Sequence, residues 1–299
     1  MTHPQHRTIA FAAAAIATIT AALTAAPART AEPLAVTVYN PGAKSMFPVA
    51  STLITGATEA VLIDAQFQRN DAEAVRGMIK ASGKKLTTIY ISHGDPDFYF
   101  GLDVLTAAYP GAKVVASPAT VRHIKATVAR KLQVWGPLLG NNAPAKTVVP
   151  AVLAGDTLTV DGAALKIIGL DGHDPKHTFV WIPSLRTVVG GVLIFEGQHV
   201  WIGDTKSQAA RDNWRKSLAV MRALEPRRIV PGHLLGASNE NDDGVAFTLA
   251  YLDAFEAAAS RTETAAGLIA AMQKRYPQFT NLKSLELSAR IVKGEMTWP

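Results

Sequence analysis

Three possible metal ligands stand at alternate positions just after an apolar stretch. Residues 87–91 (TTIYI) predict a buried strand, and His93, Asp95 and Asp97 lie on the loop that follows it. In an extended segment, side chains two residues apart point the same way, so His93 and Asp95 can bind one ion from adjacent directions. Asp-Pro-Asp is also ordinary turn chemistry that caps a following helix. Taken alone, this segment leaves both interpretations open.

Two further histidines stand at the ends of expected strands. His173 follows the apolar residues 164–170, and His233 follows residues 228–230 in the sequence Pro-Gly-His. In layered α/β folds, sites assemble at strand ends, so these histidines are candidate partners of the first segment. The chain has no cysteine, which excludes zinc-finger, thiolate and iron–sulfur chemistry. Any metal must therefore be held by histidines and carboxylates.

The surrounding sequence alternates between short apolar runs and amphipathic stretches. This order is compatible with two mixed sheets with helices outside, but spacing alone does not select that arrangement over other α/β layers. A Gly, Asn and Pro-rich loop is expected over 132–150, beside the site. The expected strands are 34–39, 51–55, 60–63, 87–91, 113–116, 157–160, 164–170, 178–182, 187–189 and 228–230; the expected helices are 71–81, 101–108, 118–131 and 212–224, with an Ala-rich helical tail from about 244.

Together, the motifs resemble those of the metallo-β-lactamase superfamily. The order is a strand, an H-x-[HD]-x-D loop at 93–97, a G-H-x-P-x-H segment at 172–177 and a P-G-H segment at 231–233. Residues 61–64 (VLID) resemble the early strand of that family, which ends in Asp. The resemblance spans residues 50–235. It implies a four-layer αββα sandwich of two mixed β-sheets, as one domain over residues 29–299.

The metal motif departs from the family pattern H-x-H-x-D-H. Asp95 stands in place of the second His, Phe98 in place of the last His, and Val192 in place of the Asp that would bridge two metals. The resemblance therefore implies a reduced ligand set, with a first position that keeps three ligands and a second that keeps two. The implied metal ligands are His93, Asp95 and His173 for the first position, and Asp97 and His233 for the second.

This division predicts one tightly held ion and a weak or absent second one. Zinc is the expected ion, because three protein ligands with an open position are typical of catalytic zinc. Iron and manganese are alternatives, since exchanging an imidazole for a carboxylate makes the site harder.

The resemblance implies a hydrolase that cleaves a small-molecule ester, lactone or amide with a metal-bound hydroxide. If the second position is empty, Asp97 is free to act as general base, and His233 can polarise a substrate oxygen. The alternative is a catalytically inactive relative that binds a ligand or a metal, because Phe98 and Val192 put apolar side chains at two ligand positions. Fold alone does not choose the substrate.

Other residues near these motifs are given structural roles first. His177 matches a family histidine that supports the ligands, and His123 is expected to be exposed. His199 is expected on the surface or in the core rather than at the site. Of the aromatic residues 98–100, two are expected to pack the start of the following helix. Trp135 and Trp201 are candidates for a substrate wall.

Residues 1–28 have the pattern of a secretory signal peptide. A polar start with one Arg precedes a weakly apolar run over 8–26, and Ala26-Pro27-Ala28 provides small residues for cleavage. An uncleaved membrane anchor is the less favoured alternative, because a spanning helix needs about 20 strongly apolar residues. The mature chain is therefore expected in the periplasm or outside the cell, without a membrane association.

The charges of the mature chain are dispersed. Basic residues exceed acidic ones, but they occur as short pairs such as Lys84-Lys85, Arg130-Lys131 and Arg227-Arg228. Such pairs are typical of solvated surface, so no nucleic-acid partner is predicted. The expected partner is a small-molecule substrate, and the sequence leaves the oligomeric state open.

Overall fold

The computed structural model describes residues 1–2 and 33–298. The predicted signal peptide, residues 1–28, therefore lies outside the described residues apart from its first two positions. Within the described part of the chain, no helix has the length and apolar character needed to cross a membrane.

The first sheet has six strands in chain order. One of them, β4, leads into the loop that carries His93, Asp95 and Asp97. Its β1–β2–β3 part is antiparallel and its β3–β4–β5–β6 part is parallel. The last residues of β4 are buried, as expected for an inner strand covered on both faces. The strands are β1 (Ala35–Tyr39), β2 (Ser51–Thr55), β3 (Glu59–Ile63), β4 (Lys85–Ile91), β5 (Lys113–Ala116) and β6 (Ala151–Val152).

The second sheet has five strands, in the order β12, β10, β9, β8 and β7. A short parallel pair of strands, β11 and β13, forms separately and carries His233. The bounds are β7 (Thr157–Val160), β8 (Ala163–Ile168), β9 (Phe179–Ile182), β10 (Thr187–Val189), β11 (Phe195–Glu196), β12 (Arg228–Ile229) and β13 (His233–Leu234).

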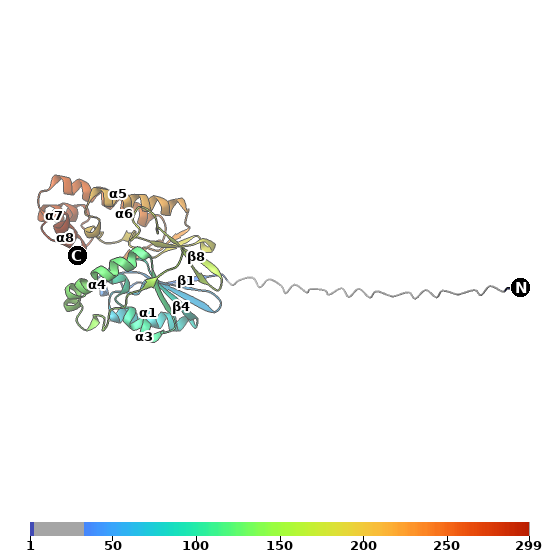
Figure 1. Ribbon diagram of the computed structural model, residues 1–299. Helices are drawn as coiled ribbons and strands as arrows, with labels where there is room; N and C mark the ends of the chain where they lie inside the picture. The colour runs from blue at the N-terminus through green and yellow to red at the C-terminus, as the bar shows by residue number, and fades with distance from the viewer. Residues whose placement is uncertain (3–32, 299) are drawn as a thin grey trace. The chain divides into compact units, whose positions relative to one another are not determined.

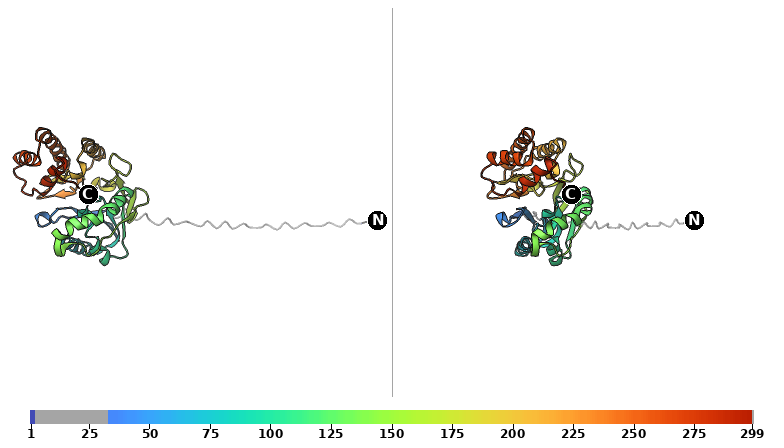
Figure 2. Two further views of the ribbon diagram at one scale, coloured as in Figure 1. Left: turned by 60° about the vertical axis from the view of Figure 1, so that its left-hand side comes forward. Right: turned by 90° about the vertical axis from the view of Figure 1, so that its left-hand side faces the viewer.

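The two sheets pack face to face between two layers of helices. Ile63 and Tyr90 of the first sheet belong to one buried cluster with Val180 and Val189 of the second. Helices α1 (Arg69–Ser82), α3 (Leu102–Ala108) and α4 (Pro118–Leu139) cover the six-stranded sheet. The opposite side carries α5 (Gln208–Ala223), α6 (Asp243–Arg261), α7 (Ala265–Arg275) and α8 (Lys283–Val292), drawn in orange to red in Figures 1 and 2. This arrangement confirms the predicted αββα sandwich.

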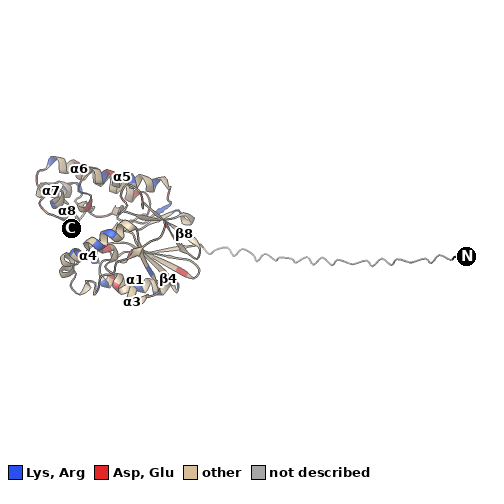
Figure 3. Ribbon diagram, viewed as in Figure 1, with Lys and Arg blue, Asp and Glu red and all other residues tan. Residues whose placement is uncertain are grey.

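Short helical turns complete the chain. Helix α2 (Pro96–Tyr99) begins inside the predicted metal loop, where Pro96 takes a first-turn position that suits proline. The 3-10 turns are η1 (Gly42–Lys44), η2 (Gly140–Asn142), η3 (Pro183–Leu185) and η4 (Gly203–Thr205). Lys, Arg, Asp and Glu are distributed over both helical layers (Figure 3).

Two predicted helical segments, 118–131 and the tail from about 244, end at residues other than those expected. Helix α4 continues to Leu139 through Pro137, so the loop predicted from 132 is wrong in its first part. The reason is tertiary packing: Trp135 is buried, and its ring lies 5.2 Å from that of Phe47 and 5.8 Å from that of Phe67. The predicted Ala-rich tail divides after Arg261, because Thr264 accepts a hydrogen bond from the Gly267 amide and starts a new helix.

A buried carboxyl group joins the ends of three strands next to the site. The Asp64 carboxylate, after β3, accepts hydrogen bonds from the Ser92 amide at 2.8 Å and from its hydroxyl at 2.7 Å. The Gly191 amide in turn donates to the Ser92 hydroxyl at 2.7 Å. Burial raises the pKa of Asp64 to about 7, although the hydrogen bonds from Ser92 oppose this shift. The network fixes the residue before His93.

We predict that Asp64 makes stability decrease as the pH rises. Its pKa in the folded chain is above the value of about 3.9 for an unfolded Asp, so the folded state holds the proton more tightly. The stabilisation is complete below about pH 4 and is lost as the pH rises through about 7, at about 1.4 kcal/mol per pH unit. Urea unfolding across this range measures it. Asp64→Asn should reduce the slope by this contribution, whereas Asp171→Asn, at an exposed aspartate, should retain it. Equal slopes in the wild type and Asp64→Asn would contradict the assignment.

Candidate metal centre

The first group of site residues is presented by the loop between β4 and α2. Because β4 is an inner strand, it delivers His93 into the interior, where the side chain is 4% exposed. Asp95 and Asp97 are buried on either side of Pro96. The His93 Nε2 atom lies 3.3 Å from Asp95 Oδ2. The structure thus brings His93 and Asp95 together, as a shared metal position requires.

Interactions on its other side hold the His93 ring in place. Its Nδ1 atom lies 3.3 Å from the carbonyl oxygen of Lys176, which leaves Nε2 facing Asp95. The His177 ring stacks on that of His93 at 4.8 Å between centroids. His177 Nδ1 in turn lies 2.7 Å from Asp174 Oδ2. This is the supporting position expected for His177.

A third carboxylate, which no motif in the sequence had indicated, completes the group. Asp204 lies on η4, and its carboxylate comes within 4.8 Å of ligand atoms of both His93 and Asp95. The Trp201 indole N–H donates to Asp204 Oδ2 at 2.6 Å and orients it. Its signal in the sequence is the dipeptide Gly203-Asp204, whereas the resemblance had put Val192 at the position of the family's bridging Asp. One imidazole and two carboxylates suit zinc, iron or manganese, so this group fits a divalent metal.

The structure does not bring His173 to this group. Its side chain is exposed, and it lines a separate cavity with Asp171, Gly172 and Ser217. Within the described residues, the ligand atom that lies with those of His93 and Asp95 belongs to Asp204 and not to His173.

Asp97 and His233 form a second pair. The His233 Nε2 atom lies 3.3 Å from Asp97 Oδ2, and the His233 ring stacks on Phe195 at 4.5 Å. Phe98 is fully buried and meets the rings of His93 and His233 edge-on, at 5.3 and 5.5 Å. Phe98 therefore places an apolar ring against both histidines, where the family motif has a ligand.

A lysine of α4 also contacts the group formed by His93, Asp95 and Asp204. Lys131 is fully buried and forms an ion pair with Asp95 Oδ1. Its ammonium also lies 3.4 Å from the Gly94 carbonyl oxygen and 3.2 Å from His123 Nε2. The expectation that His123 is exposed is therefore wrong: its ring is partly buried, because it turns inward along α4 to meet Lys131.

Burial and mutual charges set the protonation of these groups. Burial lowers the pKa of His93 and brings that of His233 to about 3, so both imidazoles are neutral. Burial alone would raise the pKa of Asp95, but Lys131 and His93 hold it well below its ordinary value. Burial and the nearby Asp95 charge raise the pKa of Asp204 to about 7.

The pKa of Asp97 is shifted in the same direction as that of Asp204, because burial and the Asp95 carboxylate raise it well above the ordinary range. When ionised, Asp95, Asp97 and Asp204 carry three negative charges, which Lys131 balances only in part. Two negative charges would then remain, and in the absence of a cation the raised pKa values of Asp97 and Asp204 allow protons to offset them.

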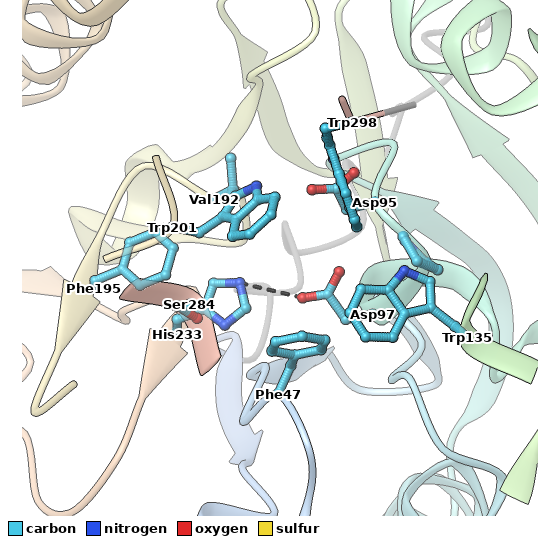
Figure 4. A pocket seen from close by; sticks show the side chains of 11 residues that line it. Phe47, Asp95, Asp97, Trp135, Val192, Phe195, Trp201, His233, Ser284 and Trp298 are labelled. Atoms are coloured by element: carbon cyan, nitrogen blue, oxygen red, sulfur yellow. Dashed lines mark ion pairs between the residues drawn. The ribbon is translucent and has the colours of Figure 1, made fainter. Parts of the chain in front are cut away.

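Two cavities border the site. Figure 4 shows Asp97 and His233 facing each other in an aromatic pocket of about 30 Å³, which Trp135, Trp201 and Trp298 help to line. The tryptophans at 135 and 201 thus line a pocket at the site, as predicted. A larger cleft, of about 450 Å³, shares Trp298 with this pocket; its lining includes His93, Asp204, His123, His177, Lys176 and Lys206.

The remaining candidates lie in the core. His199 is buried and its Nδ1 atom lies 2.9 Å from the Tyr251 hydroxyl, which confirms the core alternative for this residue. Phe98, Tyr99 and Phe100 are all buried.

Comparisons with known proteins agree with this fold. A metallo-beta-lactamase family protein of Thermus thermophilus matches with a TM-score of 0.59 and 17% identity, over 88% of this chain and 94% of that one. DIM-1 metallo-beta-lactamase exposed to ceftazidime matches with a TM-score of 0.51 and 20% identity, over 76% and 95%. A metallo-beta-lactamase from Pontibacter korlensis matches with a TM-score of 0.51 and 19% identity, over 76% and 97%.

At these identities the structures demonstrate the fold alone. No curated protein matches the sequence. The family model described as the metallo-beta-lactamase superfamily matches residues 46–233, a range that includes the metal loop and ends at His233. The chain therefore belongs to the metallo-beta-lactamase superfamily.

Proposed function

We propose that this protein is a metal-dependent hydrolase of a small-molecule ester, lactone or amide, and that it works with one tightly held divalent ion. The ligands in this proposal are His93, Asp95 and Asp204, with zinc as the expected ion and iron or manganese as alternatives. The observation that carries it is the convergence of ligand atoms of His93, Asp95 and Asp204, all within 4.8 Å of one another, in a largely buried site.

The charge balance favours one ion over two. Buried carboxylates are strongly destabilised unless a cation or a proton neutralises them. One divalent ion together with Lys131 neutralises all three aspartates. A second ion would add two positive charges to a site whose neighbouring positions are apolar, at Phe98 and Val192.

The chemistry divides between the ion and the protein. A bound divalent ion supplies Lewis acidity and lowers the pKa of water toward neutrality. Asp97 stands apart from the three ligands, and we assign it as the general base that takes a proton from the attacking water. Burial and the Asp95 charge raise its pKa, which makes its carboxylate a stronger base than an ordinary Asp. His233 orients Asp97 through the 3.3 Å contact and lines the same pocket, where it is the candidate for polarising a substrate oxygen.

The size of the cleft beside the proposed ligands supports a small substrate. The 450 Å³ cleft beside His93 and Asp204 has the size of a small-molecule site, and Lys176 and Lys206 lie on its lining. The aromatic pocket beside Asp97 would receive an apolar part of the substrate.

A catalytically inactive binding protein is the second candidate. The observation that favours it is Phe98, which fills the space between the two histidines and leaves Asp97 and His233 without a further ligand. In that case the centre binds a metal or a ligand without turnover.

We predict that Asp204 is a metal ligand and His173 is not. Asp204→Asn should weaken zinc binding by more than the about 10–100-fold that is usual for outer-shell partners, because a direct ligand is lost. His173→Ala should leave the affinity unchanged, since that side chain lies in a separate cavity. Zinc titration of chelator-treated protein and metal analysis of the loaded protein, with about one ion expected in the wild type, provide the measurement. The reverse result would restore His173 as the ligand.

Asp97 is predicted to act in catalysis rather than in metal binding. Asp97→Asn should lower kcat/KM by about 10²–10⁴-fold, the usual contribution of a general base, while the metal content stays the same. The substrates are chromogenic esters, lactones and a cephalosporin, each tested with zinc, manganese and iron. Asp171→Asn is the matched control and should be as active as the wild type. A metal-loaded wild type that turns over no member of the panel would favour the binding protein.

We further propose that the chain is exported, with cleavage after Ala28, on the strength of the signal pattern over 1–28. Expression of the full sequence in a bacterial host, followed by fractionation and N-terminal sequencing, should yield a periplasmic protein that begins at Arg29. A product that retains residues 1–28 would contradict this localisation.

A further inference from the structure

Lys131 is an unusual buried cation, because its side chain is fully buried and lies directly against the proposed metal ligands. A lysine ammonium is rarely buried without a specific set of acceptors, since loss of its hydration is strongly unfavourable. The groups around it must therefore form a site shaped for a positive charge.

Three acceptors of different kinds surround the ammonium. They are a carboxylate oxygen of Asp95, the carbonyl oxygen of Gly94 at 3.4 Å and the imidazole Nε2 of His123 at 3.2 Å. All three atom types also ligate divalent metals. We call these three groups the Lys131 cradle.

The residue at 94 makes this cradle possible. A Cβ atom at Gly94 would lie 2.5 Å from Cδ2 of His123, so a larger residue there would push the imidazole away. Both His123 and Lys131 lie on α4, and together with the metal loop they enclose the charge.

Asp95 is shared between the cradle and the metal group. One of its oxygens, Oδ1, pairs with Lys131, while Oδ2 lies 3.3 Å from His93 Nε2. The carboxylate therefore bridges the ammonium and the position proposed for the metal ion.

We propose that the Lys131 ammonium is a resident cation that takes the place of a second metal ion, held by Asp95, Gly94 and His123. The inference rests on the proposed one-metal centre and deepens it, because it identifies which group provides the second positive centre. Lys131 also positions Asp95, since its pairing with Oδ1 leaves Oδ2 directed at His93.

Removal of the ammonium should convert the cradle into a metal site. In Lys131→Ala, the carboxylate, carbonyl and imidazole face an empty space with an uncompensated negative charge, and a divalent ion can replace the lost cation. The variant should bind about two zinc ions per chain where the wild type binds about one. It should also lose thermal stability without metal and recover most of it with zinc.

The experiment measures zinc content after dialysis, and Tm with and without zinc, for four proteins. These are the wild type, Lys131→Ala, the double variant His123→Ala/Lys131→Ala, and Lys125→Ala as a control at an exposed lysine of the same helix. The double variant should return to about one zinc ion, because the imidazole ligand is gone. Lys125→Ala should match the wild type in both measurements.

A further variant addresses folding. Lys131→Gln retains a hydrogen-bond donor but not the charge, so its Tm should rise more with zinc than that of the wild type even if Lys131→Ala is too unstable to purify without metal. An unchanged zinc content in Lys131→Ala with no larger Tm response in either variant would overturn the proposal. Failure of both variants to fold in the presence of zinc would overturn it equally.

The zinc content of the wild type distinguishes a failure of this proposal from a failure of the proposed function. A wild type without bound zinc, or with two ions, contradicts the one-metal centre whatever the variants do. A wild type with one ion, and variants that gain neither an ion nor a zinc response, leaves the one-metal centre intact and removes only the role of Lys131.

Discussion

The organisation of this site depends on gathering three carboxylates in a largely buried region of the protein. Asp95 and Asp97 are buried, and Asp204 is partly exposed on the lining of the cleft, so their charges must be met largely by cations or by protons. Asp95 meets an ammonium, which keeps its pKa low. Asp97 and Asp204 do not pair with the ammonium, and burial and the Asp95 charge raise their pKa values. The same residues therefore determine the protonation of the site and the charge that a divalent ion would neutralise.

The fold supplies the rigidity that this charge cluster requires. Opposing charges in a low dielectric are useful only if the protein fixes their geometry, because relaxation would bring in water or separate the pairs. The Asp64–Ser92–Gly191 network ties together the chain segments that carry His93 and Val192. Helix α4 is anchored through the packing of Trp135, four residues beyond Lys131. The position of the ammonium thus depends on aromatic residues that also line the pocket beside Asp97.

The sequence predicted the fold because the motifs stand at strand ends, and their order along the chain is specific to one architecture. It predicted His93, Asp95, Asp97 and His233 as neighbours for the same reason. Asp204 was not predicted because its Gly-Asp dipeptide lies in the short turn η4, with no strand directly before it. Lys131 escaped because Arg130-Lys131 has the composition of solvated surface and the predicted helix ended there. Its register was informative, however: Val121, Ile124, Lys131 and Trp135 recur at helical spacing and are all buried.

The position of Lys131 on α4 bears on how the apolar replacements Phe98 and Val192 are interpreted. Phe98 and Val192 stand where ligands would hold a second ion. Taken alone, these two residues indicate only a loss of metal-binding side chains. Lys131 adds a positive charge that no ligand motif records, on an element that the motif does not include. In the role proposed for Lys131, a metal centre keeps its balance of charge while its ligand pattern decays, because an ammonium and a metal ion can satisfy the same buried carboxylate. For chains of this kind, counting ligands underestimates how complete the site is, and the buried charges of the neighbouring helices must be counted with them.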